Sequence, residues 1–175
     1  MKNSASDADN TNDSMPSYNT NVVNFAPLGD VSPHNLVEAK GVCSVIIVSY
    51  KTGEVLMDCI HSVLRQSKLH QLILVDNGNT KQAVQQLNEI ADKNPKFEII
   101  TGHGNVGFSK GCNLGVRRAR GEYILLLNPD SILQTDTLIP ALEVFKTHPD
   151  TSLLTVRIEN LDGTEQRGAR RNLMT

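Results

Sequence analysis

The stretch that decides the fold is Cys43-Ser44-Val45-Ile46-Ile47-Val48, which Ser49-Tyr50-Lys51-Thr52-Gly53 follows. Its nearly continuous run of apolar, largely β-branched residues predicts a strand that is covered on both faces, as in a parallel sheet. The polar segment after it ends the strand. Apolar residues then recur at helical spacing and predict an amphipathic helix that ends near Ser67, with a stripe made of Leu56, Cys59, Ile60, Val63 and Leu64.

This strand–helix unit repeats along the chain. Helices are predicted over residues 83–91 and 109–118, and a further one begins near Asp136 or Thr137. Between the helices, apolar runs predict strands at residues 72–75, 97–100, 123–127 and 153–156. Strands and helices in alternation predict an α/β fold with a Rossmann-like, mostly parallel sheet and helices on both faces.

The first 40 residues differ in composition from the rest. They are rich in Asn, Asp, Ser and Thr, and their two basic and five acidic residues give a charge of −3, whereas the other 15 basic and 14 acidic residues give +1. Such a segment buries too little apolar surface to offset its ordering entropy. We therefore predict a disordered tail over 1–40, in which only Val22-Val23-Asn24-Phe25 could dock on the body, and one domain over 41–175.

Composition also narrows the class of protein. The nearly neutral body contains no Trp, which argues against nucleic acid as a partner. Cys43, Cys59 and Cys112 are scattered without CxxC spacing, which indicates reduced thiols and a cytoplasmic location. No apolar run reaches the roughly 18–20 residues of a membrane-spanning helix, so at most a loose attachment to a membrane face is compatible with the sequence.

Ligands of open parallel sheets bind outside the carboxyl ends of the strands. Asp76 is predicted at that edge, where it could accept hydrogen bonds from a nucleobase or from ribose hydroxyls. As part of Asp76-Asn77-Gly78-Asn79 it could equally be a turn or helix-capping residue, which its residue type alone favours. The other polar segments predicted at this edge are Ser49-Tyr50, Gly102-His103-Gly104 and Asn128-Pro129-Asp130.

Asp130 projects from a turn that Pro129 stiffens. A single carboxylate, completed by two phosphate oxygens and waters, suits Mg²⁺ or Mn²⁺, although a plain loop turn is the alternative. Lys110 is predicted in the first turn of a helix, where free N–H groups favour an anion such as a pyrophosphate, although a solvated lysine is common there. Asn113, one turn further, could bond a sugar hydroxyl or cap the local backbone.

A dinucleotide-binding alternative arises from Gly102-His103-Gly104-Asn105-Val106-Gly107, which matches the GxGxxG pattern. Asp130 would then be the acidic ribose ligand. The match follows the third predicted strand of the body, whereas that fingerprint normally occupies the first strand–helix turn of its unit. An NAD-dependent oxidoreductase is therefore the least favoured of the hypotheses.

Taken together, the motifs resemble the family 2 glycosyltransferases, and particularly their rhamnosyltransferase-like branch. The likeness covers Val42 to Arg171 and follows the family's motif order: Val45-Ile46-Ile47-Val48-Ser49-Tyr50; Ser62-Val63-Leu64-Arg65-Gln66-Ser67; Leu74-Val75-Asp76-Asn77-Gly78; Asn105-Val106-Gly107-Phe108 with Gly111, Asn113 and Gly115; and Gly121-Glu122-Tyr123-Ile124-Leu125-Leu126-Leu127-Asn128-Pro129-Asp130. The resemblance implies a GT-A fold that binds a nucleoside-diphosphate sugar.

The resemblance also implies roles for individual residues. Asp130 occupies the second acidic place of the family's DxD-type motif and would ligate Mg²⁺ or Mn²⁺, while Asn128 stands where many members have the first Asp. The backbone of Ser49-Tyr50 and Asp76 would hold the nucleobase and ribose. The nucleotide-sugar site as a whole would comprise Ser49, Tyr50, Asp76, Asn77, Gly107, Lys110, Asn113, Asn128 and Asp130.

The reaction that the resemblance implies is an inverting displacement on a dTDP- or UDP-linked sugar, such as rhamnose, with a cell-surface polysaccharide or lipid-linked acceptor. Its carboxylate base is expected beyond Thr175, because Glu159, Asp162 and Glu165 align with no family base. Three hypotheses result: a glycosyltransferase whose chain stops before the acceptor half, a nucleotide-sugar-binding module that works with a partner chain supplying that half, and the oxidoreductase.

Overall fold

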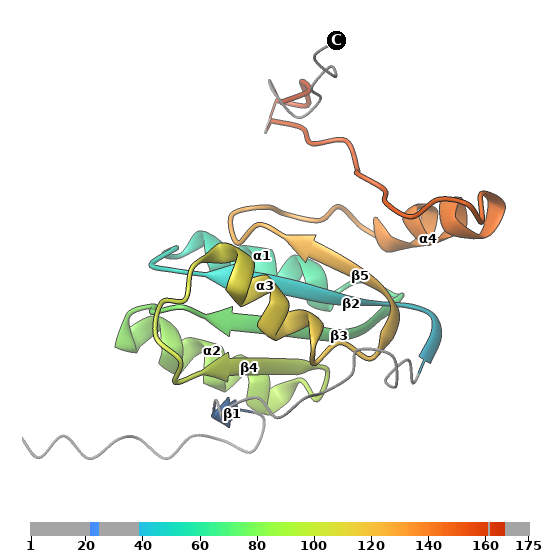
Figure 1. Ribbon diagram of the computed structural model, residues 1–175. Coiled ribbons are helices and arrows are strands. Elements are labelled where there is room, and N and C mark those ends of the chain that lie inside the picture. The colour runs from blue at the N-terminus through green and yellow to red at the C-terminus, as the bar shows by residue number, and fades with distance from the viewer. Residues whose placement is uncertain (1–21, 25–38, 161, 167–175) are drawn as a thin grey trace, which may run out of the picture.

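One parallel sheet organises the molecule. The computed structural model describes residues 22–24, 39–160 and 162–166. Its strands form a single sheet in the order β1-β4-β3-β2-β5, and each pairing is parallel (Figure 1). The elements in chain order are β1 (Val22–Asn24), β2 (Ala39–Ser49), α1 (Val55–Leu64), β3 (Leu69–Asp76), α2 (Lys81–Lys93), β4 (Phe97–Thr101), α3 (Phe108–Val116), β5 (Gly121–Leu127) and α4 (Leu138–Thr147).

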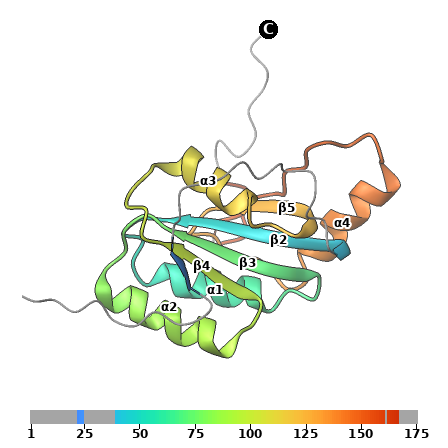
Figure 2. The ribbon, with the colours of Figure 1, turned by 60° about the horizontal axis from the view of Figure 1, so that its bottom comes forward.

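Helices cover both faces of the sheet, as predicted. Figures 1 and 2 show α3 on one face and α1 and α2 on the other. Val45 and Ile47 of β2 belong to the core cluster that includes residues of α1, α2 and α4, whereas Ile46 and Val48 pack with Cys112 of α3. Because β2 is buried on both faces, its apolar run is unbroken.

The strand order reverses at β2. From β2 the chain builds β3 and then β4 on one side, and α3 carries it back across the sheet to β5 on the other side. The carboxyl ends of β2 and β5 therefore form a topological switch point. In open α/β sheets, this is the place where the loops diverge and leave a crevice for a ligand.

Two glycines let α3 lie directly on β2. A Cβ atom at Gly111 would come within 2.7 Å of Val48 Cγ1, and one at Gly115 would collide with Ile46 Cγ2. The glycine pattern in this part of the sequence thus has a packing cause, because any larger side chain would push the helix off the sheet.

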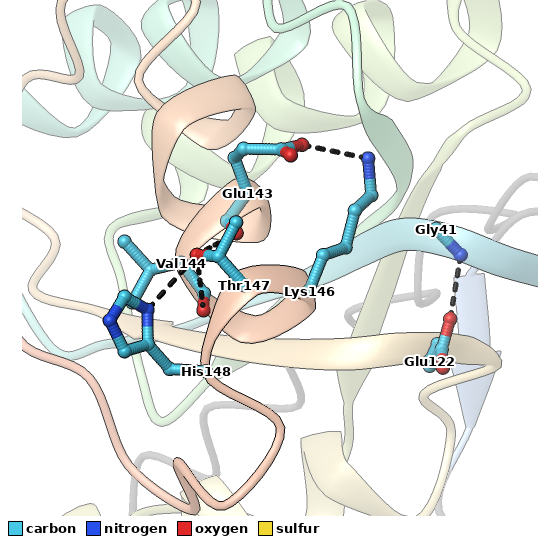
Figure 3. Close-up of polar contacts among 7 residues, drawn as sticks. All are labelled: Gly41, Glu122, Glu143, Val144, Lys146, Thr147 and His148. Atoms are coloured by element: carbon cyan, nitrogen blue, oxygen red, sulfur yellow. Dashed lines mark hydrogen bonds and ion pairs between the residues drawn. The ribbon is translucent and has the colours of Figure 1, made fainter.

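A local irregularity joins the beginnings of β2 and β5. Ala39 pairs with Gly121 and Cys43 pairs with Tyr123, so β2 has two more residues than β5 between these pairs. Gly41 adopts a φ of 69° here, and its N–H donates to Glu122 Oε2 at 2.7 Å (Figure 3). The Glu122 carboxylate thus accepts a hydrogen bond from a backbone N–H at the point where the register of the two strands shifts.

The C-terminal turn of α4 is closed by its own side chains. Thr147 Oγ1 donates to the carbonyl oxygens of Glu143 at 2.9 Å and Val144 at 3.3 Å, and Lys146 Nζ lies 2.9 Å from Glu143 Oε2 (Figure 3). After this turn the chain runs away from the sheet (Figure 1).

The predicted strand at residues 153–156 is wrong. The only β pairing of described residues 148–160 is an isolated bridge from Glu159 to Glu165, and Leu153 is 83% exposed. The apolar run gains no partner strand there, so its composition alone does not make it a strand.

One prediction of disorder and two boundaries also need correction. Val22–Asn24 pairs with β4, so this part of the expected disordered tail is a strand, as the docking patch suggested. β2 begins at Ala39, before the predicted boundary at 40, and α1 ends at Leu64 rather than near Ser67. The predicted disorder of 1–21 and 25–38 lies outside the described residues. In the described part of the chain, no helix has the length and apolarity to cross a membrane.

Candidate functional site

The parallel strands bring the predicted polar segments to one edge of the sheet. Ser49 ends β2, Asp76 ends β3, residues 102–107 follow β4 and residues 128–130 follow β5. Since α3 begins at the same edge, its first turn joins this group. The placement that the sequence predicted for these residues is therefore present in the fold, with β2 and β3 in the middle and β4 and β5 on either side.

Asp76 closes a tight turn with its own side chain. Its Oδ1 accepts hydrogen bonds from the N–H groups of Gly78 (3.0 Å) and Asn79 (2.9 Å) and from Asn79 Nδ2 (2.7 Å). This is an Asx-type turn, so the turn role that we weighed for Asp76 is present. The three bonds all fall on one carboxylate oxygen. A nucleotide role for Asp76 stays a prediction.

Ser49 braces the loops after β2 and β3. It is fully buried, its hydroxyl lies 2.8 Å from Thr52 Oγ1, and it donates to Asn79 Oδ1 at 3.0 Å. Its carbonyl oxygen accepts from the N–H of Asn77 at 2.9 Å. The Ser49 side chain thus holds the loops at this edge together. The ligand contact predicted for the Ser49-Tyr50 backbone stays a prediction.

Tyr50 presents an aromatic ring at the same edge. The side chain is half exposed, and a Cβ atom at Gly78 would lie 3.4 Å from its Cε2 atom, so the ring lies against the turn that Asp76 shapes. Lys51 Nζ lies 5.3 Å from the ring centroid, within the range of a cation–π interaction. An aromatic face in this position can stack on a nucleobase.

Asn77 connects β3 to the beginning of α3. It is buried, and its Nδ2 donates to the carbonyl oxygen of Gly107 at 3.2 Å, while its Oδ1 lies 3.1 Å from His103 Nε2. The sequence placed His103 at this edge, within Gly102-His103-Gly104, but indicated no role for its side chain. Its position in the loop between a strand and the helix-opening glycine was the signal that could have revealed the role.

The first turn of α3 faces the edge with positive character. Gly107, at φ 79°, is the N-cap, and its N–H donates to Asn105 Oδ1 at 2.9 Å. Lys110 and Asn113 are both exposed, and the turn contains no acidic residue. Helix N–H groups, the helix dipole and a lysine ammonium together favour a bound anion.

Asn128 and Asp130 lie in the turn after β5. Asn128 O accepts from the N–H of Ser131 at 3.2 Å, which closes a turn around Pro129 and Asp130, and both Asn128 and Asp130 are exposed. In the described chain, no group of three or more His, Cys, Asp and Glu side chains is arranged to hold a metal. A cation here would need ligands from a bound phosphate as well as from Asp130.

Comparison with known proteins identifies the family. The model of a family described as glycosyl transferase family 2 matches residues 44–174, which is most of the chain. The chain belongs to this family. The glycosyltransferase GlyG of Streptococcus pneumoniae serotype 4 is 26% identical over 96 residues, which are 54% of this chain and 32% of that protein. A poly-beta-1,6-N-acetyl-D-glucosamine synthase of Staphylococcus epidermidis is 26% identical over 125 residues, 71% of this chain and 29% of that protein.

This family 2 chain spans about a third of the length of the first curated relatives that it matches. Among solved structures, S. aureus TarS 1-349 in complex with UDP superposes with a TM-score of 0.55 at 22% identity, over 62% of this chain and 33% of that one. The likeness confirms the predicted GT-A fold. Neither comparison favours the NAD-dependent alternative.

Proposed function

We propose that this chain is the donor-binding part of an inverting family 2 glycosyltransferase. It binds a nucleoside-diphosphate sugar at the carboxyl edge of the sheet. The nucleobase and ribose lie by Tyr50 and Asp76, the diphosphate lies between the first turn of α3 and Asp130, and Lys110 and Asn113 line the pocket. Asn77, Gly107 and Ser49 shape it.

The observation that supports this proposal best is the convergence of three chemically different groups at the topological switch point. An exposed aromatic ring, the N-terminal turn of a helix with Lys110, and the exposed carboxylate of Asp130 all belong to loops at one edge. A nucleoside diphosphate carries the matching parts: a planar base, an anionic diphosphate and phosphate oxygens that share a divalent cation.

The residues fit Mg²⁺ or Mn²⁺ as a cofactor that arrives with the donor. Asp130 supplies a hard oxygen ligand, and the donor diphosphate supplies others. When bound, the cation would neutralise charge on the departing diphosphate. Asn128 would act through the shape of the turn rather than as a charged ligand, because an amide carries no charge.

The transfer itself needs an acceptor hydroxyl and a base. The acceptor oxygen attacks the anomeric carbon, the bond from this carbon to the diphosphate oxygen breaks, and the proton moves to a carboxylate. Glu159 lies 3.1 Å from Arg157 Nε, and Asp162 accepts from Thr164 Oγ1 at 2.6 Å. In sequence, neither of them nor Glu165 aligns with the base of the family. We place the base in an acceptor half, supplied by a longer chain or by a partner chain.

The finer assignments follow from the resemblance in the sequence. We propose a UDP- or dTDP-linked donor, with rhamnose as one sugar to test, and a cell-surface polysaccharide or lipid-linked acceptor at the cytoplasmic face of a membrane. The complex of S. aureus TarS with UDP supports the nucleotide class, and the similarity to a poly-beta-1,6-N-acetyl-D-glucosamine synthase supports a role in polysaccharide synthesis.

Calorimetric titration tests the donor site. UDP and dTDP, and then their sugars, are titrated with Mn²⁺ or with EDTA into the wild type, Asp130→Ala and Asp92→Ala, the last removing an exposed carboxylate of α2 as a charge control. We expect Mn²⁺-dependent binding that Asp130→Ala abolishes and Asp92→Ala retains. Binding of NADH in place of these nucleotides would overturn the proposal, and release of nucleoside diphosphate with an acceptor would separate transfer from binding alone.

A further inference from the structure

The loop that carries Asp130 is fastened to one side of α1. This loop, residues 128–137, connects β5 to α4. Cys59, Ser62 and Gln66 occur at intervals of three and four residues, and all three side chains are buried. Each of them bonds to the backbone of the loop, so the two segments are held together by side-chain-to-backbone hydrogen bonds at several separate points.

The first half of the loop is held by Cys59 and Ser62. The Cys59 thiol lies 3.5 Å from the carbonyl oxygen of Asn128 and is oriented to donate to it. Ser62 Oγ donates to Cys59 O at 2.7 Å and accepts from the N–H of Leu133 at 3.0 Å. The Ser62 hydroxyl therefore donates its proton to a carbonyl oxygen of α1 and accepts a hydrogen bond from an N–H of the loop. Asp130 lies between these two attachment points.

The second half of the loop is held by Gln66. Its Nε2 donates to Gln134 O at 2.8 Å and to Ser62 O at 3.2 Å, and its Oε1 accepts from the N–H of Leu138 at 3.2 Å. Leu138 begins α4, and the N-cap residue Thr137 makes no side-chain capping bond. Gln66 thus supplies from another element the acceptor that the first turn of α4 lacks.

Ser62 and Gln66 make no bond to the Asp130 side chain. They bond instead to the backbone of the segment that follows Asp130. Leu133 and Leu138 are buried in the core, whereas Asp130 and Ile132 are exposed. An exposed carboxylate on a turn has a defined position only if the segments on both sides of it are fixed. The bonds from α1 and from Gln66 in the turn after it provide that fixation.

We propose that Gln66, together with Ser62, is a positioning residue for Asp130, and that it keeps the Asp130 carboxylate where a diphosphate-bound cation can meet it. This inference rests on the proposed donor site. The Ser62-Val63-Leu64-Arg65-Gln66-Ser67 motif lies at the end of α1 and in the turn after it, and it contains none of the residues proposed to contact the donor. The positioning role would connect this motif to the donor site.

The chain offers a closely matched control, Gln71 on β3. Gln66 is 4% exposed and Gln71 is 3% exposed. Gln71 also makes three bonds: its Nε2 donates to Arg118 O at 3.2 Å, and its Oε1 accepts from Ser44 Oγ at 3.1 Å and from Arg120 N at 2.8 Å. Gln71 lies near the amino end of its strand, and its partners belong to β2 and to the connection between α3 and β5.

The test compares Gln66→Met with Gln71→Met, since methionine keeps the length and removes the hydrogen bonds. We expect similar losses of thermal stability in both. Of these two variants, only Gln66→Met should speed hydrogen exchange of the Leu138 amide, because it removes the acceptor of that amide. Only Gln66→Met should raise the Kd of UDP in Mn²⁺, by about 10- to 100-fold, as for residues that orient metal ligands. Ser62→Ala removes the acceptor of the Leu133 amide, so it should speed exchange of that amide and raise the same Kd by less. It serves as the test if Gln66→Met does not fold.

The outcomes separate this inference from the proposed function. Unchanged Mn²⁺-dependent affinity in Gln66→Met, or an equal loss in Gln71→Met, would overturn the positioning role while leaving the donor site in place. A wild type that binds neither UDP nor dTDP in Mn²⁺ would overturn both proposals together. Faster amide exchange with a matching loss of Mn²⁺-dependent affinity, confined to the Gln66 and Ser62 variants, supports the positioning role.

Discussion

The side chain of Asn77 donates to the carbonyl oxygen of Gly107 at 3.2 Å, so the residue after β3 holds the N-cap of α3 directly. Because Asn77 Oδ1 also lies 3.1 Å from His103 Nε2, this one amide joins the loop after β3 to two points of the loop between β4 and α3. The first turn of α3 and the turn shaped by Asp76 therefore hold a set position relative to each other.

Replacing this amide should cost both stability and donor binding. In Asn77→Ala the carbonyl of Gly107 loses the amide donor but keeps the bond from the Gly111 N–H, so we expect the free energy of unfolding to fall by about 0.5–1.5 kcal/mol, as for a typical hydrogen bond. Calorimetry should show weaker UDP binding. Asn94→Ala is the control, because Asn94 Nδ2 donates to Ile90 O at 2.7 Å at the C-terminus of α2. Equal loss of UDP affinity in both variants would contradict the role of Asn77.

A methyl group at Gly115 should separate α3 from β2. The Cβ atom of Gly115→Ala would collide with Ile46 Cγ2, which is attached to a stiff β-branched side chain in the core. We expect a loss of about 1–3 kcal/mol in urea unfolding, as for other overpacked cores. Ser109→Ala, on the exposed side of the same helix, should change stability by less than about 0.5 kcal/mol. A stabilised Gly115→Ala would show that the helix is not seated as described.

Glu98 should make the protein less stable as pH rises. Its Oε1 is buried and finds no hydrogen-bond partner among the described residues, and Arg118 Nε is 3.9 Å away. Burial raises the pKa of Glu98, and the charges of Arg118 and Arg120 oppose this rise. The folded state therefore binds more protons than the unfolded state at pH values between the two pKa values, and stability is lost as pH rises through the folded pKa.

Glu98→Gln removes the ionisation but keeps the shape. We expect its free energy of unfolding, measured across pH by urea denaturation, to fall less than that of the wild type above the ordinary glutamate range. The exposed Glu89 of α2 provides the control, and Glu89→Gln should follow the wild type. If Glu98→Gln and the wild type showed parallel pH profiles, the carboxyl would be titrating as it does in the unfolded chain.

Two of the three cysteines should be inert in the native protein. Burial raises the pKa of Cys43 and of Cys59 to about 12, and at Cys59 the Asp130 carboxylate adds to the rise while a backbone bond from Ser131 opposes it. Because the thiolate is the nucleophile, neither should react with a disulfide reagent at pH 8. Mass spectrometry after brief labelling should find both unmodified, and labelled in urea. Fast native labelling of Cys43 would mean that the sheet opens at its start.

Most of the sheet could be predicted from the sequence, because parallel strands that are buried on both faces consist of unbroken runs of apolar residues. Residues 43–48, 72–75, 97–100 and 123–127 all lie in strands of the structure. The run at 153–156 has the same composition and is not a strand, since strand formation also requires a neighbour in space. The short β1 was recognisable only as an apolar patch in a polar segment, because three residues carry no periodicity.

The site was harder to predict in detail than in outline. Parallel topology alone brings Asp76 and Asp130 to the same edge, and this followed from the strands. Which side chains are engaged in holding that edge together did not follow. Ser49, Asn77 and Gln66 are buried and fully involved in contacts between loops that lie far apart in the sequence. Such partners depend on tertiary packing, which local pattern does not encode.

The reversal of strand order at β2 also has a consequence for how the protein is made. Cys43 pairs with Leu69 of β3 but also with Tyr123 of β5, which is synthesised 80 residues later. At about 5–20 residues per second, one edge of β2 stays unpaired for some 4–16 s until its second neighbour is synthesised. During that interval β2 and β3 can already pair, and the nascent chain exposes an apolar strand edge to other chains. Pairings over such long separations also raise the contact order and slow folding.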